Sequence, residues 1–355
     1  MTRVVEAQPG WRGRLHGFLG TCRWVADGPL PRVRVIPDST WDGRSPDNAP
    51  FLLRPLPPRN GPACEVVVLP GEPTRIVVRN QHAQTDGQGT MLLARAFFAT
   101  LRGDEPPRAV FGPLSDAGLA RQLGVAPEKI PVNDAAPVAG PAAPATFGIT
   151  WQRHRVEGQF SDLLPRLALL LARGIERRPD QTIRMVIPVD MRRHVPDLIS
   201  TANLTGLIRL PVHELMEDSE PVAAIKNSLR RAMDNREEAR VMPAVGFLRW
   251  LPTAFAAWIA KGGFRRSLRA GAHGSTAILS NLGRLDLAAF SGGGFQARRV
   301  FFIPPGNPGL PLFLGISGDD TGVELCGTMP LGLATDGRLG RLLESLGEGL
   351  RRGTR

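Results

Sequence analysis

The sequence predicts an α/β protein built from two lobes. Short β-branched runs fill residues 1–80, and a helix-forming run follows them at residues 91–101. A stretch rich in proline and alanine comes later, and a second series of strand-like and helix-like runs begins after it. We therefore assign residues 1–130 to an N-terminal lobe, 131–147 to a linker and 148–355 to a C-terminal lobe. A chain of 355 residues is long enough for two lobes and a sizeable core.

Three runs of the N-terminal lobe have the composition of strands. They are PRVRVIPD at residues 31–38, CEVVVLP at 64–70 and TRIVVRN at 74–80. Clusters of proline and glycine separate them, as expected for loops. The run MLLARAFFATL carries apolar residues on several faces, which predicts a largely buried helix.

The C-terminal lobe is expected to begin with a helix. The run SDLLPRLALLLARGIERR predicts a helix capped by Ser161 or Asp162. The other predicted elements are a buried strand at 182–190, an amphipathic helix at 220–241, a strand at 275–283, a hairpin at 311–329 that turns at 319–322, and a helix at 336–350.

The most apolar late segment is GFLRWLPTAFAAWIAKGGF, residues 246–264. Arg249, Pro252 and Lys261 interrupt it too often for a transmembrane helix. It is either a core helix of the second lobe, the interpretation we favour, or an amphipathic surface that meets membrane lipid or an acyl chain. The N-terminus lacks an apolar stretch with a small-residue cleavage site, so we expect a cytoplasmic protein.

Charge and cysteine content narrow the class of partner. The net charge is +11, and only three of the 44 basic residues are lysines. Arginine suits phosphate and carboxylate binding, which points to an anionic partner. The sequence has no zinc-finger spacing, aromatic RNP-type strand or basic arm, so we do not expect nucleic acid to be that partner. Cys22, Cys64 and Cys326 are odd in number and far apart, which favours neither a disulfide framework nor a metal site.

The segment NQHAQTDGQG lies where a predicted strand gives way to a predicted helix. A neutral imidazole at His82 can accept a proton near neutral pH. Asp86 can pair with a distant arginine, and Gly87 permits a tight turn or a positive φ. Spacing alone favours a surface-loop histidine and a chance His-x-x-x-Asp pattern. No third ligand lies near in the sequence, so we expect no metal here.

This segment resembles the HHxxxDG signature of the condensation-domain and chloramphenicol-acetyltransferase-like superfamily. Its members include nonribosomal peptide condensation domains, polyketide-associated acyltransferases, alcohol acetyltransferases and plant BAHD enzymes. The match places His82 at the catalytic histidine, Asp86 at the structural aspartate and Gly87 at the glycine. Gln81 stands where the signature has its first histidine.

Two downstream segments are similar to the same superfamily, in the same order. In VIPVDMRRHVPDLISTANLTG, Arg192 matches the arginine that pairs with the motif aspartate, and Asn203 and Gly206 match an Asn-x-x-Gly element. In STAILSNLGRLD, Ser280 and Asn281 match a Ser-Asn-x-Gly strand. Taken singly, each of these matches has a structural explanation. Arg192 could be a solvated arginine, Asn203 could cap a turn, and the run SNLG could be the exit of a loop. Together they support one architecture, and the similarity extends from about residue 66 to the C-terminus.

The resemblance implies two chloramphenicol-acetyltransferase-like lobes of mixed sheets and helices, with a substrate tunnel between them. It implies an acyltransferase with no bound cofactor, which moves an acyl group from a thioester of CoA or of a phosphopantetheinyl acyl carrier protein to a small-molecule hydroxyl or amine, as in natural product biosynthesis. His82 is then the general base, and Asp86, Gly87 and Arg192 brace the site. The remaining candidates, for substrate or oxyanion contacts, are Gln81, Asn203, Ser280 and Asn281.

The N-terminus departs from the superfamily pattern. His82 comes earlier in the chain than the catalytic histidine usually does, and the expected opening helix is not evident. We expect Trp11, Trp24 and Trp41 to pack where the missing elements would lie. The short N-terminus and Gln81 leave a second hypothesis open, a catalytically inactive condensation-like scaffold that binds a carrier protein or an acylated ligand.

Overall fold

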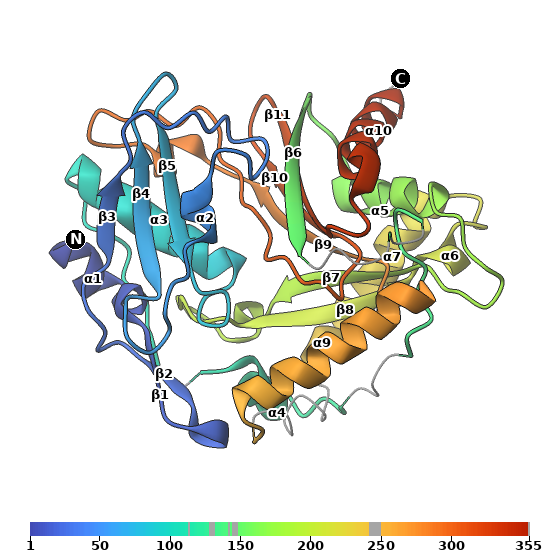
Figure 1. Ribbon diagram of the computed structural model, residues 1–355, viewed down its shortest axis with the longest axis horizontal. Coiled ribbons are helices and arrows are strands. Elements are labelled where there is room, and N and C mark those ends of the chain that lie inside the picture. Colours follow the sequence, from blue (N-terminus) through green and yellow to red (C-terminus); the bar gives the residue numbers. More distant parts are fainter. Residues whose placement is uncertain (113, 128–131, 141–142, 144–147, 241–249, 354–355) are drawn as a thin grey trace.

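The computed structural model describes residues 1–355 except 113, 128–131, 141–142, 144–147, 241–249 and 354–355. Its described residues form a three-stranded sheet, a six-stranded sheet and a small two-stranded hairpin. Figure 1 shows the two larger sheets in separate lobes, blue and green to red, with helices packed beside each. The predicted α/β class and its mixed sheets are therefore confirmed.

The predicted N-terminal lobe supplies the smaller sheet. Its strands are β3 (Arg32–Val35), β4 (Cys64–Leu69) and β5 (Arg75–Asn80), in the order β3-β4-β5. β3 runs parallel to β4, and β5 antiparallel to it. The remaining elements are α1 (Thr2–Ala7), η1 (Pro9–Arg12), β1 (Arg14–His16), η2 (Leu19–Thr21), β2 (Arg23–Val25), α2 (Pro50–Leu53), α3 (Gly87–Arg102) and α4 (Asp116–Gln122), where η marks a 3₁₀ turn.

The three predicted strands coincide with β3, β4 and β5, and the predicted helix lies within α3. α3 begins before the predicted start, because Asp86 caps it by accepting a hydrogen bond from the backbone N–H of Gly89 at 2.8 Å. Its apolar side packs on β4: Val66, Leu93 and Phe97 belong to one buried cluster.

The six-stranded sheet has the order β6-β11-β10-β9-β7-β8. β9 runs parallel to both β7 and β10, and the other pairs are antiparallel. The strands are β6 (Ile149–Glu157), β7 (Arg184–Asp190), β8 (Thr205–Pro211), β9 (Ala277–Arg284), β10 (Phe313–Gly318) and β11 (Gly322–Pro330). The helices and turns are α5 (Leu163–Arg173), η3 (Met191–His194), α6 (Val212–Leu215), α7 (Pro221–Asp234), η4 (Glu237–Ala239), α9 (Thr253–Ala270), η5 (Leu287–Phe290), η6 (Thr335–Gly337) and α10 (Arg338–Arg352).

In this lobe the structure differs from the sequence prediction at the start of α5 and at β6. Asp162 occupies the N-cap position of α5 but makes no capping hydrogen bond, because its carboxylate pairs with Lys226 Nζ at 2.7 Å. β6 was not predicted, and its sequence includes Arg153 and Arg155. These arginines disguise the strand, since their charge is paired with Glu324 on the neighbouring β11.

Two hydrophobic clusters contain residues from both the N-terminal and the C-terminal part of the sequence. After β9 the chain crosses to the N-terminal lobe, where Leu285, Phe290 and Ala297 join the cluster that contains Val66. This segment is the darker orange trace behind β3–β5 in Figure 1. A second cluster joins Trp41 to Trp151 on β6, with ring centroids 6.2 Å apart. Residues from distant parts of the sequence thus build the smaller lobe.

The segment assigned to a linker is only partly described, since residues 131, 141–142 and 144–147 are outside the described part. Its described portion packs onto the C-terminal lobe: Ala135 bridges Thr182 and His273, and Val138 belongs to the core of the larger sheet. The segment is thus in contact with folded structure at these positions.

The N-terminal tryptophans are placed differently from one another. Trp11 is fully buried and Trp41 nearly so, in two separate clusters, whereas Trp24 on β2 is half-buried. A short opening helix, α1, is present although the sequence did not indicate one.

Helix α9 is a surface element, so the favoured expectation of a core helix at 246–264 was wrong. The described part of that stretch leaves Phe255, Trp258 and Ile259 exposed. Phe264 and Leu268 turn inward, and Leu268 packs against the core of the larger sheet. Among the described residues, no helix is both long and apolar enough to cross a membrane.

Candidate active site

The candidate site is built on the loop that joins β5 to α3. The backbone N–H groups of Gln84 and Thr85 donate to the carbonyl of Gln81 at 3.0 and 3.1 Å, which closes a tight turn around His82. The N–H of Gln81 donates to the carbonyl of Ala63 at 2.8 Å. The first residue of the loop is therefore bonded to the residue that precedes β4.

His82 is exposed at the tip of this turn. Asn203, from the segment before β8, holds the turn from the other lobe: its Nδ2 donates to the His82 carbonyl at 2.9 Å, and its backbone N–H donates to the Gln84 carbonyl at 2.8 Å. No described residue forms a hydrogen bond with the imidazole itself. The backbone of His82 is thus held while its ring nitrogens stay accessible.

Asp86 has every acceptor position occupied. It is 2% exposed and caps α3 through Gly89. Arg192 Nη1 and Nη2 each donate to it at 3.1 Å, in a two-point contact between the lobes. The N–H of Leu204 and the hydroxyl of Thr205 donate to the same carboxylate at 2.8 and 3.2 Å. This carboxylate organises the site and has no acceptor capacity left for a substrate.

Arg192 is itself buried and fully engaged. Its Nε donates to the Ser200 carbonyl at 2.9 Å, its Nη2 donates to the Ala202 carbonyl, and its Nη1 also donates to Asp190 at 2.7 Å. Burial by itself lowers the pKa of Arg192, but the carboxylates of Asp86 and Asp190 outweigh it and raise that pKa above its ordinary value. Arg192 is therefore held as a cation where it contacts Asp86 between the two lobes.

Three glycines permit the close approach of these elements. Gly87 does not have a positive φ, contrary to one expectation; it is the first residue of α3, and a Cβ there would lie 3.1 Å from Leu282 Cδ2. A Cβ on Gly89 would lie 2.6 Å from the carbonyl oxygen of Thr201. A Cβ on Gly206 would clash with the carbonyl oxygen of Glu238. Gly89 was not predicted from the sequence, although it ends the run QTDGQG that contains the motif.

The other candidates contribute unequally. Gln81 Nε2 donates to the Leu56 carbonyl, so this amide group anchors the loop. Ser280 and Asn281 lie on β9, whose Leu282 contacts the first turn of α3. Asn281 Oδ1 accepts from the N–H of Gly283 at 2.9 Å. Its Nδ2 and the hydroxyl of Ser280 form no hydrogen bond with a described residue.

Two further residues of the site were not predicted. Gln84 is 2% exposed, and its Nε2 donates to the Gly10 carbonyl, which links the loop to the N-terminal segment. Thr205 contributes the hydroxyl that reaches Asp86. The sequence does not reveal the burial of Gln84; the structure does, and a glutamine in the interior needs hydrogen-bond partners.

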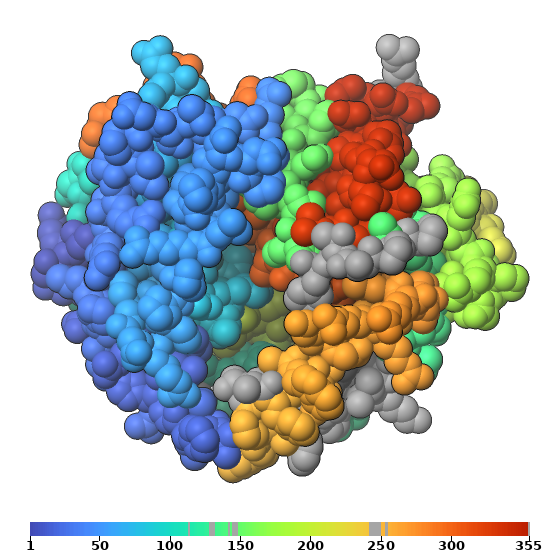
Figure 2. All heavy atoms as spheres, viewed as in Figure 1, coloured from blue at the N-terminus to red at the C-terminus, as the bar shows by residue number. Residues whose placement is uncertain are grey.

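Figure 2 shows a hollow between the blue N-terminal lobe and the orange helix α9, with teal and olive segments on its floor. Two defined cavities lie elsewhere. One, of about 530 Å³, lies along α9 and the other, of about 370 Å³, lies beside α7. Neither is lined by His82, so a substrate tunnel through the site stays a prediction. No cluster of three or more His, Cys, Asp or Glu suited to a metal occurs in the described part of the chain.

Comparison with known proteins gives a structural match and no match in sequence. No family model matches the chain, and neither does any curated protein. The condensation domain from Monacolin K polyketide synthase MokA superposes with a TM-score of 0.57 at 14% identity, covering 99% of this chain and 88% of that one. This chain has the condensation-domain fold.

Two other solved structures have a similar fold. The first condensation domain of the calcium-dependent antibiotic synthetase, in complex with a substrate analogue, gives a TM-score of 0.57 at 13% identity and covers 98% of this chain and 84% of that one. The epimerization domain from the third module of tyrocidine synthetase B gives 0.52 at 12% identity, with 99% and 85% coverage. The predicted two-lobe condensation-domain fold is confirmed.

Proposed function

We propose that this protein is an acyltransferase. It transfers an acyl group from a thioester of CoA or of a phosphopantetheinyl carrier protein to the hydroxyl or amine of a small molecule. The observation that carries the proposal is the loop at His82. It presents an exposed imidazole on a backbone held from both lobes, close to the Asp86 carboxylate, whose acceptor positions are all occupied by protein groups, Arg192 among them. The condensation-domain fold supports the proposal, since the resemblance of the motif and the likeness of the fold point to the same class.

In this mechanism His82 acts as the general base. Its unprotonated ring nitrogen accepts the proton of the acceptor hydroxyl or amine as that atom attacks the thioester carbonyl. A carbon–oxygen or carbon–nitrogen bond forms, and the carbon–sulfur bond then breaks. The thiolate leaves and takes the proton from the imidazolium, so that the free thiol is released and His82 returns to its neutral form. No acyl-enzyme forms, because the acceptor attacks the donor directly.

Asp86 and Arg192 are positioning residues in this scheme. Asp86 faces Arg192, Leu204 and Thr205, so it serves the geometry of the loop and takes no part in proton transfer. Asn203 completes the support by holding the His82 carbonyl. A base that must meet a bound acceptor at hydrogen-bond distance gains most from this kind of fixed backbone.

The tetrahedral intermediate needs a donor for its oxyanion. Ser280 and the Nδ2 of Asn281 are our candidates, since they have no partner among the described residues and their strand reaches the start of α3 through Leu282. The net charge of +11 suits either donor, because CoA and an acylated carrier protein both bring phosphate to the site.

The test is to incubate the wild-type protein and His82→Ala with a panel of acyl-CoA and acyl-carrier thioesters, each with mixed alcohols and amines. Mass spectrometry follows both the loss of thioester and the gain of acylated product. Product from the wild type alone supports the proposal and names the donor. If neither protein yields product although every thioester stays intact and both proteins are folded, the inactive scaffold becomes the better explanation. Binding of an acylated carrier protein to the wild type then identifies its ligand.

A further inference from the structure

The outward face of α9 combines exposed aromatic rings with arginines. Phe255, Trp258 and Ile259 are 49%, 70% and 43% exposed, and the first two rings stack with centroids 5.9 Å apart. Arg265 and Arg269 follow further along the helix and are four residues apart, so they are neighbours on its surface. We call Phe255, Trp258, Ile259, Arg265, Arg266 and Arg269 the α9 stripe. It is apolar in its first half and cationic in its second.

The apolar end of the α9 stripe is extended by a second segment of the chain. Trp250 is 52% exposed, and its ring lies against Gly20, where a Cβ would come within 2.7 Å of it. Phe18, two residues before Gly20, is 70% exposed. Figure 1 shows the β1–β2 hairpin beside the first turns of α9. Large apolar side chains from two distant parts of the sequence therefore gather at one place on the surface.

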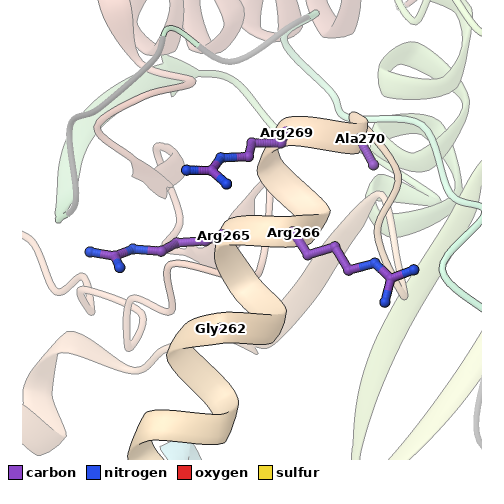
Figure 3. Close-up of a pocket in the computed structure, with 5 residues that line it drawn as sticks. All are labelled: Gly262, Arg265, Arg266, Arg269 and Ala270. Atoms are coloured by element: carbon purple, nitrogen blue, oxygen red, sulfur yellow. The ribbon is translucent and has the colours of Figure 1, made fainter.

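The cationic end borders a cavity and carries no acid. Figure 3 shows Arg265 and Arg269 extending to one side of α9 and Arg266 to the other, around the cavity that they line with Gly262 and Ala270. These three arginines form no ion pair with a described residue. The 18 residues of α9 include Lys261 and three arginines but neither aspartate nor glutamate. By contrast, the side chains of Arg102 and Arg178 pair with neighbouring aspartates.

We propose that the α9 stripe docks the protein on the surface of an anionic phospholipid bilayer. Exposed tryptophan and phenylalanine favour the boundary between headgroups and acyl chains, and arginines beside them bind lipid phosphates. An acidic protein partner would satisfy the arginines but would not require the exposed rings of Trp258 and Phe18. The helix lies on the bilayer and does not cross it, in keeping with the interruptions in its apolar character. This inference is independent of catalysis by His82.

The experiment measures cosedimentation with sucrose-loaded vesicles, either of phosphatidylcholine alone or of two parts phosphatidylcholine to one part phosphatidylglycerol, the anionic component. We expect binding to the anionic vesicles that weakens in high salt, and little binding to the neutral ones. The triple variant Arg265→Gln, Arg266→Gln, Arg269→Gln should bind roughly 100-fold more weakly, since each basic residue near an anionic bilayer contributes about a factor of five.

Two further variants separate lipid docking from charge alone. Phe255→Ser with Trp258→Ser should weaken binding to anionic vesicles by about tenfold or more without changing the net charge. The matched control changes three exposed arginines away from the stripe, Arg173, Arg230 and Arg231, to glutamine, and should bind within about threefold of the wild type.

Weak binding of both stripe variants, with normal binding of the control, supports the proposal. Equal loss in the control would mean that net charge alone drives association, and would overturn it. The proposal is also overturned if the wild type does not bind vesicles. It is likewise overturned if an acidic acyl carrier protein binds the α9 stripe in a salt-sensitive way and vesicles do not.

Discussion

Replacing Arg192 with methionine should destabilise the protein by about 3–5 kcal/mol. The change keeps most of the side-chain volume but removes the only cation that faces Asp86 in the described interface, where both partners are less than a tenth exposed. A buried carboxylate that loses its ion-pair partner is left uncompensated, and costs of this size follow. Asp86 keeps its hydrogen bonds from Gly89, Leu204 and Thr205, so we expect a cost within this range and not above it.

The assay is urea unfolding followed by tryptophan fluorescence, with the free energy of unfolding taken from the midpoint and slope. A double-mutant cycle with Asp86→Asn isolates the pair, because the double variant should be more stable by about 1 kcal/mol or more than the sum of the two single changes predicts. The control is Arg230→Met on α7, an exposed arginine, which should alter the free energy of unfolding by less than about 0.5 kcal/mol. A loss below about 1 kcal/mol for Arg192→Met, with additive changes in the cycle, would refute the pairing as the contact that joins the lobes at this site.

Two other predictions concern stability. Gly89→Ala should destabilise the protein by about 1–3 kcal/mol, because the added methyl group meets the backbone carbonyl of Thr201. Gly263→Ala within α9 should stabilise it by up to about 1 kcal/mol, because the added methyl group has no neighbour within 4 Å. Thermal unfolding compares the two variants, and equal effects would contradict the steric argument. Burial lowers the pKa of His273 to about 4 in the folded protein. As the pH falls below about 6.5, the histidine is protonated in the unfolded chain before it is protonated in the folded one. The free energy of unfolding therefore decreases by about 3 kcal/mol between neutral pH and pH 4. His273→Leu should remove that part of the acid sensitivity in urea titrations at pH 7 and pH 4, and an unchanged difference would assign it to other groups.

The local parts of the site could be predicted from the sequence. The run before His82 has the β-branched composition of a strand and the run after Asp86 that of a helix, so the loop between them was correctly located. The partner of Asp86 is 106 residues away, and only the resemblance to the superfamily pointed to Arg192. Spacing alone does not reveal an ion pair between two lobes, because it depends on how the sheets are brought together.

Long-range packing explains what the sequence did not reveal. Gly89 is needed because the backbone of Thr201 passes within 2.6 Å of its missing Cβ, and no local pattern encodes that approach. β6 carries arginines at positions where a strand is expected to have apolar residues, and their acidic partner lies on β11. The aromatic residues of α9 were expected in the core on hydrophobicity alone, yet they lie on the surface, where a cluster of apolar side chains indicates an interaction site.

The proposed function depends above all on His82 as the residue that moves the proton. The most direct test is the turnover of His82→Ala beside that of Gln81→Ala, with the donor and acceptor that the wild type uses and with circular dichroism to show that both variants are folded. Gln81 is the adjacent residue, and its amide contacts the Leu56 carbonyl. We predict a loss of about 100-fold or more for His82→Ala, the usual contribution of a general base, and a loss below about tenfold for Gln81→Ala. Turnover of folded His82→Ala within about tenfold of the wild type would contradict a general base at this position.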